Sequence, residues 1–323
     1  MSGAKKQHYV PRFYLKSFST QQNNEYFTNC FDKSDLSHFK VNIKEIGCEN
    51  YFYGISPAHS QEVEKILADY DSQFTKVYNK LTSIASISCL NWKEKEVFAQ
   101  FITIQELRTR EMREHLRDMV KTLNTQLSDK PLSAKLEKDL KRVNTEEGIR
   151  IIHSGFILET LLKKNNLVDM LVDLKWILFE NNTTIPFWTS DHPVNRYNPI
   201  DLSPYGNLGT LCRGIQIFFP LTPKLEIAFC DPIEYFFMPE KSSCEKDNLL
   251  FYNTLQARSN ARHIFSINSD FSVAKKWLRQ SPESMPLDRK RISTDVRFNK
   301  NYNDKDYFFD PTFRYFYANK YME

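Results

Sequence analysis

Two short segments that lie far apart in the chain each place ionisable side chains beside a proline. The first contains His8 and Arg12 around Pro11, and the second contains Asp191 and His192 directly before another proline. A proline fixes its own φ angle and restricts the preceding residue to extended geometry. Both segments should therefore have the stiff backbone that a preorganised catalytic or binding site requires.

Asp191 and His8 are the candidate proton-transfer groups. The proline two residues after Asp191 should end a strand, so that the carboxylate is presented at the strand end. There it could activate water, stabilise a developing cation or hold a metal. Neutral imidazole at His8 could act as a base or a metal ligand, because the reference pKa of histidine is about 6.5. His192 could add a second proton-transfer group or contact the substrate. The structural alternatives stay open: Asp191 or Ser190 could close a turn, and His8 could be a structural residue.

Arg108 is the third candidate for a catalytic role. Phe101 and Ile104 precede it by seven and four residues, so helical spacing places it on their apolar face. A cation on such a face needs a carboxylate, a phosphate or dense hydrogen bonding. One interpretation is a clamp for an anionic substrate, which suits a planar guanidinium. The other is an ion pair inside the protein, for which there are three candidate partners: Glu64, Glu106 and Asp191.

Further residues are candidates for contacting a substrate. Asn253, Gln256 and Asn260 are spaced by three and four residues, so they share one face of a predicted helix. This face could line a site or be solvated. Arg262 could bind substrate or form a structural ion pair, and Tyr14 could contact substrate or belong to the core.

The elements that must position these residues form strands first, then helices, then strands again. Strands are expected at 25–30, 39–43, 51–53, 215–219 and 225–229, and the segments 174–179 and 185–188 are expected to pair as a hairpin. Apolar residues at helical spacing predict five main helices: 60–85, 91–123, 146–162, 249–265 and 271–278. Asn91 and Glu94 have the spacing of a capping box. The order of elements predicts an α+β fold, with antiparallel sheet elements at both ends flanking a central group of long helices.

The predicted organisation is one α+β domain over residues 1–270, with a helical middle at about 60–165. The segment 271–323 is basic and rich in aromatics, with ten aromatic residues between Phe298 and Tyr321. We expect it to pack on the body through these aromatics. The alternative is contact with nucleic acid, because aromatics suit base stacking and cations suit phosphates.

Composition narrows the class of protein. Hydrophobic residues make up 41% and charged residues 26% of the chain, which is typical of a soluble globular protein. Only 8 of the 323 residues are glycine, and no glycine-rich phosphate loop or nucleophile elbow is present. No apolar run approaches the roughly 20 residues of a membrane span, and no signal peptide is visible. The six cysteines are scattered, which indicates reduced thiols in the cytoplasm and no zinc site.

The segment QHYVPRFYLKSF at residues 7–18 resembles the N-terminal signature of a bacterial domain-of-unknown-function family, number 4238. The resemblance continues through 49–53, the helix around Glu64, 101–109 and PFWTSDHP at 186–193, and reaches about Asp270. His192 departs from the smaller polar residue, such as Asn, that is expected there. The family has no assigned activity, so the resemblance implies candidate residues and no mechanism.

These observations lead to three hypotheses about function. The first is a hydrolase of nucleic acids or nucleotides in bacterial antiphage defence, either a nuclease or a base-removing glycosylase; the defence setting follows from the resemblance alone. In it, Asp191 activates water, His8 transfers a proton, and Arg12 and Arg108 bind phosphate. The second is a non-enzymatic binding or sensor module. The third is a metal-dependent hydrolase of small molecules that uses His8, Asp191 and His192 as ligands. The sequence indicates no particular cofactor or oligomeric state.

Overall fold

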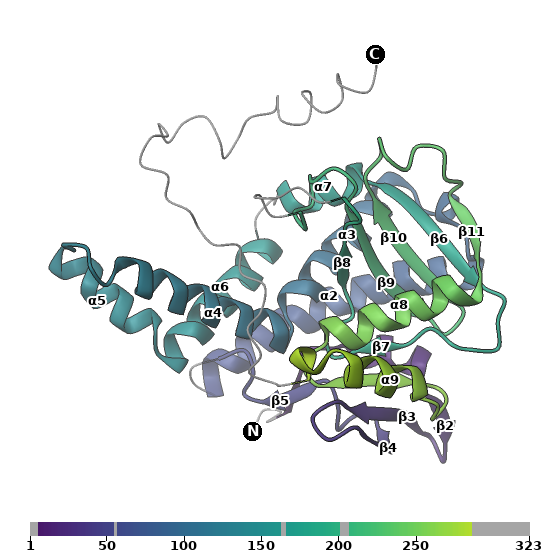
Figure 1. Ribbon diagram of the computed structural model, residues 1–323, viewed down its shortest axis with the longest axis horizontal. Helices are drawn as coiled ribbons and strands as arrows, with labels where there is room; N and C mark the ends of the chain where they lie inside the picture. Colours follow the sequence, from purple (N-terminus) through teal and green to yellow (C-terminus); the bar gives the residue numbers. More distant parts are fainter. Residues whose placement is uncertain (1–5, 55–56, 163–165, 201–206, 286–323) are drawn as a thin grey trace.

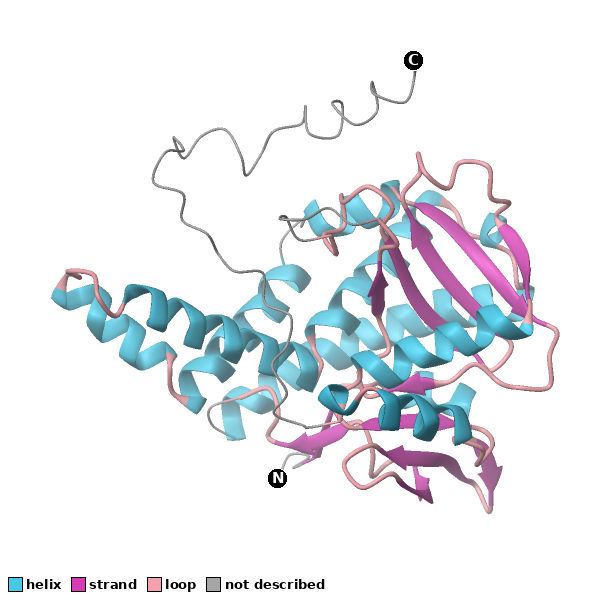
Figure 2. Cartoon of the chain, in the orientation of Figure 1, coloured by secondary structure: helices cyan, strands magenta, loops and turns pink. Residues whose placement is uncertain are grey.

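The computed structural model describes residues 6–54, 57–162, 166–200 and 207–285 (Figure 1). The fold class is α+β, as predicted, with strands at both ends of the chain and long helices between them (Figure 2). Most of the predicted C-terminal segment, including all aromatics from Phe298 to Tyr321, lies outside the described residues.

Apart from the short α1 and η1 near the N-terminus, the helices of the described residues occupy the middle of the chain and its later part. Their bounds are α1 (Arg12–Leu15), α2 (Pro57–Ile84), α3 (Trp92–Leu107), α4 (Arg110–Leu127), α5 (Ala134–Val143), α6 (Glu146–Leu162), α7 (Asn166–Asp173), α8 (Lys246–Ser259) and α9 (Ser272–Gln280), with short 3-10 turns η1 (Lys16–Phe18), η2 (Ile87–Cys89) and η3 (Pro282–Ser284). The helices predicted at 60–85, 146–162 and 271–278 are thus confirmed.

Within the described residues the strands form three sheets. The smallest pairs β1 (Lys6–His8) with β5 (Cys48–Asn50). A second sheet has the order β11 (Lys241–Cys244), β6 (Lys175–Asn181), β10 (Leu225–Cys230), β9 (Gln216–Thr222) and β8 (Asn195–Tyr197). The third has the order β2 (Thr20–Gln22), β3 (Glu25–Asp32), β12 (His263–Ser266) and β7 (Thr189–Ser190), with β4 (Ser37–Asn42) also paired to β3. All pairs are antiparallel except β11 with β6.

The five-stranded sheet around β10 is covered on both faces (Figure 1). Ile227 and Phe229 of β10 pack in the main core with α2 and α3, whereas Ala228 and Cys230 pack with the side chains of α8. A strand buried on both faces needs apolar residues at consecutive positions, which explains the apolar run from Ile227 to Cys230.

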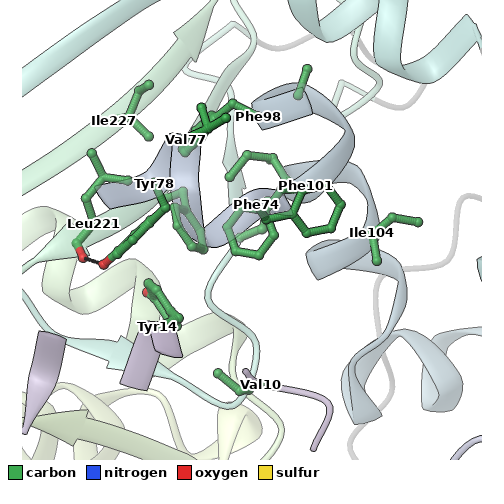
Figure 3. Packing of buried hydrophobic residues seen from close by; sticks show 14 of the residues in the cluster. Val10, Tyr14, Phe74, Val77, Tyr78, Phe98, Phe101, Ile104, Leu221 and Ile227 are labelled. Carbon is green, nitrogen blue, oxygen red and sulfur yellow. Dashed lines mark hydrogen bonds between the residues drawn. The ribbon is translucent and has the colours of Figure 1, made fainter. Parts of the chain in front are cut away.

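Tyr14 and Tyr78 anchor the main core (Figure 3). The Tyr14 hydroxyl bonds to Thr189 Oγ1 at 2.6 Å and donates to the carbonyl oxygen of Pro220 at 2.7 Å. Because Thr189 and Pro220 belong to different sheets, Tyr14 joins the two sheets. The Tyr78 hydroxyl donates to the carbonyl oxygen of Leu221. The core interpretation of Tyr14 is therefore the one that its contacts support.

The predicted hairpin of 174–179 with 185–188 is wrong. β6 pairs instead with β10 and β11. The segment after β6 has its backbone bonded to side chains: Asn253 accepts from the backbone N–H of Trp188 at 2.8 Å and donates to the carbonyl oxygen of Pro186 at 3.0 Å. Asn181 donates to the carbonyl oxygen of Ile185 in the same way, at 2.6 Å. Because these side chains bind the backbone N–H and carbonyl groups of the segment, it does not pair with β6. It continues instead into β7, which belongs to another sheet.

Two predicted helices extend too far. The helix predicted over 91–123 begins at the capping box of Asn91 and Glu94, as expected, but ends at Leu107. A new helix then begins because the Thr109 side chain accepts from the backbone N–H of Met112 as an N-cap. The helix predicted over 249–265 ends at Ser259, and its last residues form β12.

The strand predicted at 51–53 is also wrong. These residues form a turn after β5, in which Tyr51 has a positive φ of 51°. Phe52 and Tyr53 pack in the core, and the Tyr53 hydroxyl donates to the carbonyl oxygen of His8 at 2.9 Å. The strands predicted at 25–30 and 39–43 and the pair at 215–219 and 225–229 are confirmed.

Candidate functional site

Asp191 is buried and holds a backbone turn. Its Oδ1 accepts from the backbone N–H of Ala261 at 2.8 Å. Its Oδ2 accepts from the backbone N–H groups of Arg262 and His263 at 2.8 and 2.9 Å. Only 1% of the residue is exposed. The carboxylate thus ties the end of β7 to the turn between α8 and β12, and both of its oxygens are engaged.

Arg108 is fully buried and forms an internal ion pair, although with none of the three expected partners. Its Nη1 lies 3.0 and 3.2 Å from the two carboxylate oxygens of Asp71 on α2, and its Nε donates to Gln105 Oε1 at 2.9 Å. Burial raises the pKa of the Asp71 carboxyl, and the nearby guanidinium opposes this rise. These contacts support the ion-pair interpretation of Arg108 over the substrate clamp.

His8 lies on β1, opposite Cys48 of β5. Burial, together with the charge of Arg12, lowers the pKa of His8 to about 4, so the imidazole is neutral near pH 7. Its Nε2 has no hydrogen-bond partner among the residues that the structure describes. Arg12 itself is exposed. His8, Arg108 and Asp191 thus have three separate sets of partners, and their role as one catalytic group stays a prediction.

The other expected substrate contacts also have structural partners. Asn253 holds the backbone before β7, as described above, and only 1% of it is exposed. Gln256 accepts from the Ser190 hydroxyl at 2.7 Å and donates to the carbonyl oxygen of Pro193 at 2.9 Å. His192 Nδ1 lies 2.7 Å from Thr109 Oγ1, at the start of α4. The polar helix face of Asn253 and Gln256 therefore points into the protein.

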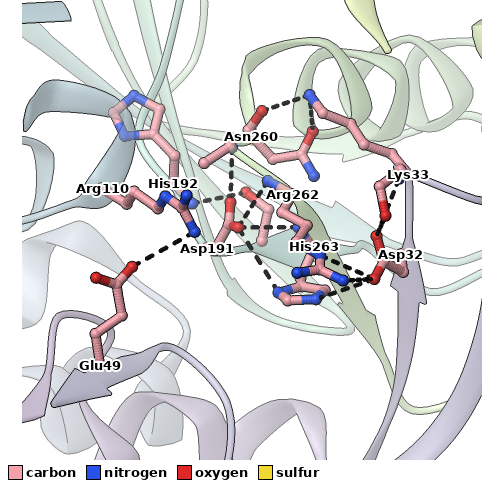
Figure 4. A network of polar contacts seen from close by, with 12 residues as sticks. Asp32, Lys33, Glu49, Arg110, Asp191, His192, Asn260, Arg262 and His263 are labelled. Atoms are coloured by element: carbon pink, nitrogen blue, oxygen red, sulfur yellow. Dashed lines mark hydrogen bonds and ion pairs between the residues drawn. The ribbon is translucent and has the colours of Figure 1, made fainter. Parts of the chain in front are cut away.

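The chain instead brings a different set of charged groups together around His263 (Figure 4). The imidazole lies between two carboxylates: its Nε2 is 3.6 Å from Asp32 Oδ2, and its Nδ1 is 4.0 Å from Asp191 Oδ2. His263 keeps 21% of its side chain exposed, whereas the side chains of Asp32 and Asp191 keep 5% and 1%. The site therefore offers solvent an imidazole supported by two buried anions.

Two arginines flank this imidazole. Arg262 donates from Nε and Nη2 to Asp32 Oδ2, at 2.9 and 2.6 Å, and its side chain is 40% exposed. Arg110, at the first position of α4, has 36% of its side chain exposed and lies 3.6 Å from Glu49 Oε1. That distance is too long for a hydrogen bond, so Arg110 is held loosely by its partner.

The charges of this cluster act on one another. Burial lowers the pKa of His263, while Asp191 and Asp32 raise it and the two arginines lower it further. Burial alone would raise the pKa of Asp32, but hydrogen bonds from Arg262 and Ser34 outweigh it and lower the pKa to about 2. Near pH 7 the cluster thus combines a neutral imidazole, an ionised Asp32 and two guanidinium cations.

A buried lysine reinforces the frame of this cluster. Lys33, next to Asp32, donates from Nζ to the backbone carbonyl oxygen of Asn260 at 2.5 Å and to its side-chain oxygen at 3.1 Å. Asn260 directly precedes the residues whose amides bind Asp191. Strand β3 and the turn before β12 are thereby fixed against each other.

The sequence predictions included Arg262 and Asp191 of this cluster and missed His263, Asp32 and Arg110. The helix predicted over 249–265 contains His263, and Asp32 lies beyond the end of the strand predicted at 25–30. The ionisable pair Asp32-Lys33 follows the apolar residues of β3, and the pair Arg262-His263 precedes the apolar residues of β12. These two pairs were the signal in the sequence that could have indicated the cluster. Only the pairing of β3 with β12 shows that they lie side by side.

Within the described ranges, no group of three or more histidine, cysteine or acidic side chains is arranged to hold a metal ion. No helix in those same ranges is long and apolar enough to cross a membrane. None of the six cysteines, which all lie within the described residues, forms a disulfide.

A family model described as "Protein of unknown function (DUF4238)" matches residues 6–270. The match covers most of the chain, and the protein belongs to this family. The matched range includes every residue of the cluster around His263. No curated protein and no solved structure matches the chain.

Proposed function

We propose that this member of the DUF4238 family is a hydrolase of phosphodiester bonds in nucleic acids, with His263 as its general base. One observation carries the proposal. A partly exposed, neutral imidazole lies between two buried carboxylates and is flanked by Arg110 and Arg262, each with more than a third of its side chain exposed. The combination of a base with cations is what attack of water on a phosphodiester requires.

Each group has a role that follows from its chemistry. His263 takes a proton from water as the water oxygen attacks phosphorus, and the bond from phosphorus to the leaving oxygen breaks. Asp32 and Asp191 stabilise the imidazolium that results, because both lie within 4.0 Å of the ring nitrogens. Arg110 and Arg262 bind the non-bridging phosphate oxygens, since guanidinium groups match phosphate geometry. The imidazolium then protonates the leaving group.

A nuclease fits these contacts better than a base-removing glycosylase. A glycosylase needs a carboxylate that can reach the sugar ring and stabilise its developing charge. Both oxygens of Asp191 already accept backbone N–H groups, and Asp32 Oδ2 accepts two bonds from Arg262. A cytoplasmic location and a part in antiphage defence stay predictions of the sequence and of the family resemblance.

A second candidate is a binding module that holds an anionic ligand without cleaving it. It is favoured by the engagement of Asp191 and Arg108 in contacts that stabilise the fold. The cations Arg110 and Arg262 serve equally well in both functions. The two candidates differ in whether the imidazole of His263 takes part in a reaction.

The test is hydrolysis of labelled single-stranded and duplex DNA and RNA by the wild type and by His263→Asn. General base catalysis contributes roughly 10²–10⁴-fold, so we expect a rate loss of that size with an unchanged melting temperature. The matched control is His38→Asn, the same change at an exposed histidine of β4. Hydrolysis that survives His263→Asn would refute the assigned base. Binding by the wild type without any hydrolysis would favour the binding module.

A further inference from the structure

Three helices, α4, α5 and α6, form an arm that projects from the body of the protein (Figure 1, Figure 2). α5 packs against α6, and α6 packs against α4. The arm begins at the candidate site, because Arg110 is the first residue of α4. The 18 residues of α4 span about 27 Å at a rise of about 1.5 Å per residue. The tip of the arm is thus held at a defined distance from His263.

The tip carries a surplus of positive charge. Residues 121–143 contain six Lys or Arg and three Asp or Glu, a surplus of three, while the whole chain has a formal net charge of +4. Four of these cations lie on α5 and are exposed: Lys135, Lys138, Lys141 and Arg142. Among the described residues, none of the four forms an ion pair. Nearer the body, by contrast, Arg117 pairs with Glu114 and Glu146.

The cations of α5 have the spacing of a stripe. Lys135, Lys138 and Arg142 follow one another by three and four residues, so they share one face of the helix. The stripe is about 10 Å long, from seven residues at about 1.5 Å each. A duplex carries one charge per about 1.7 Å of its axis, so this length faces about three phosphates on each strand. The stripe therefore matches a nucleic-acid backbone in both sign and length.

We infer that α5 is a binding surface for the phosphate backbone of nucleic acid. It contacts the nucleic acid at a distance from the phosphate that is bound at the candidate site. The inference rests on the proposed function for the identity of the partner, and it adds a second point of contact at the tip of the arm. Backbone contacts of this kind position a nucleic acid without reading its sequence.

The experiment uses the full chain and the triple variant Lys135→Glu, Lys138→Glu, Arg142→Glu. The matched control reverses the same number of exposed cations on α8 and α9: Lys246→Glu, Lys276→Glu and Arg279→Glu. Affinity for a fluorescent duplex is measured between about 50 and 200 mM salt, where log K falls by about 0.9 per phosphate contact for each unit of log salt. Hydrolysis of the small phosphodiester bis(4-nitrophenyl) phosphate and melting temperature are measured in parallel.

We expect the α5 variant to reduce the salt slope by about 2–3 and to weaken binding, with melting temperature and hydrolysis of the small substrate unchanged. The control variant should keep the slope of the wild type. Equal losses in both variants, or an unchanged slope in the α5 variant, would overturn the inference, and so would binding to vesicles of anionic phospholipid with no binding to nucleic acid. Failure of His263 as a base is read separately: hydrolysis then survives His263→Asn, or the wild type hydrolyses no substrate, while binding and its salt slope are retained.

Discussion

Asp191 and His263 are joined twice. The carboxylate of Asp191 accepts a hydrogen bond from the backbone N–H of His263 at 2.9 Å, and the side chain of His263 places its Nδ1 4.0 Å from the same oxygen. One buried anion thus fixes the backbone that carries the imidazole and also acts on the charge of the ring. Substitution of Asp191 should therefore affect both the backbone turn and the imidazole of His263.

Asp191→Asn should destabilise the protein. The new amide group would point hydrogens at backbone N–H groups, so at least one of the three bonds from residues 261–263 is lost. Hydrogen bonds to a buried charge contribute about 1.5–3 kcal/mol each, so we expect a loss of about 3 kcal/mol in the free energy of unfolding, measured in urea. Asp129→Asn, at an exposed aspartate, is the control. An unchanged stability with abolished hydrolysis would instead restore Asp191 as the catalytic group.

Removing only Asp71, the partner of Arg108, should lower the free energy of unfolding more than removing both residues of the pair. Asp71→Ala leaves a fully buried guanidinium without its carboxylate, and stranding a buried charge costs about 3–5 kcal/mol. The double variant Asp71→Ala, Arg108→Met should recover part of that loss, because no charge is then left unpaired. Chemical denaturation of the two single variants and the double variant measures the coupling. Strictly additive losses would show that the ion pair has no net energetic coupling.

Glu226 should make stability depend on pH. It lies in β10 with 1% exposed, and its Oε2 has no hydrogen-bond partner among the described residues. Burial raises its pKa well above the usual 4.5, so the folded protein holds a proton that the unfolded chain releases. The stability that this proton contributes is fully present below about pH 4.5. It is lost progressively as the pH rises toward the pKa of Glu226 in the folded protein.

Glu226→Gln should therefore be more stable than the wild type at pH 8, and the difference should shrink toward pH 5. Urea unfolding at a series of pH values measures it. Glu240→Gln, at an exposed position, should leave the pH dependence unchanged. A constant difference between Glu226→Gln and the wild type at every pH would contradict the prediction.

Thr109→Val should weaken the start of α4. The Thr109 hydroxyl caps this helix at the backbone N–H of Met112 and bonds to His192 Nδ1. Loss of an N-cap costs about 1–2 kcal/mol, and Thr109→Ser, which keeps the hydroxyl, should recover most of it. Thermal unfolding followed by circular dichroism compares the two variants. Equal melting temperatures for the valine and serine variants would show that the hydroxyl contributes nothing.

The sequence by itself determined the fold class, the helices α2 and α6 and the start of α3. The period of apolar residues in α2 and α6 and the spacing of Asn91 and Glu94 are local properties, because a helix bonds each residue to one four positions away. The mainly apolar segments 215–219 and 225–229 likewise indicated a strand pair, which β9 and β10 form. The family resemblance, which rested on local motifs, was confirmed by the family model that matches residues 6–270.

The tertiary structure decided which segments meet. Whether 185–188 paired with β6 depended on Asn253, which comes from a distant helix and takes the backbone groups of that segment. The end of α8 depended on Asp191, which takes the N–H groups of residues 261–263. The partner of Arg108 and the surroundings of His263 come from separate parts of the chain. Such contacts depend on the packing of whole elements, and the spacing of residues along the chain does not encode them directly.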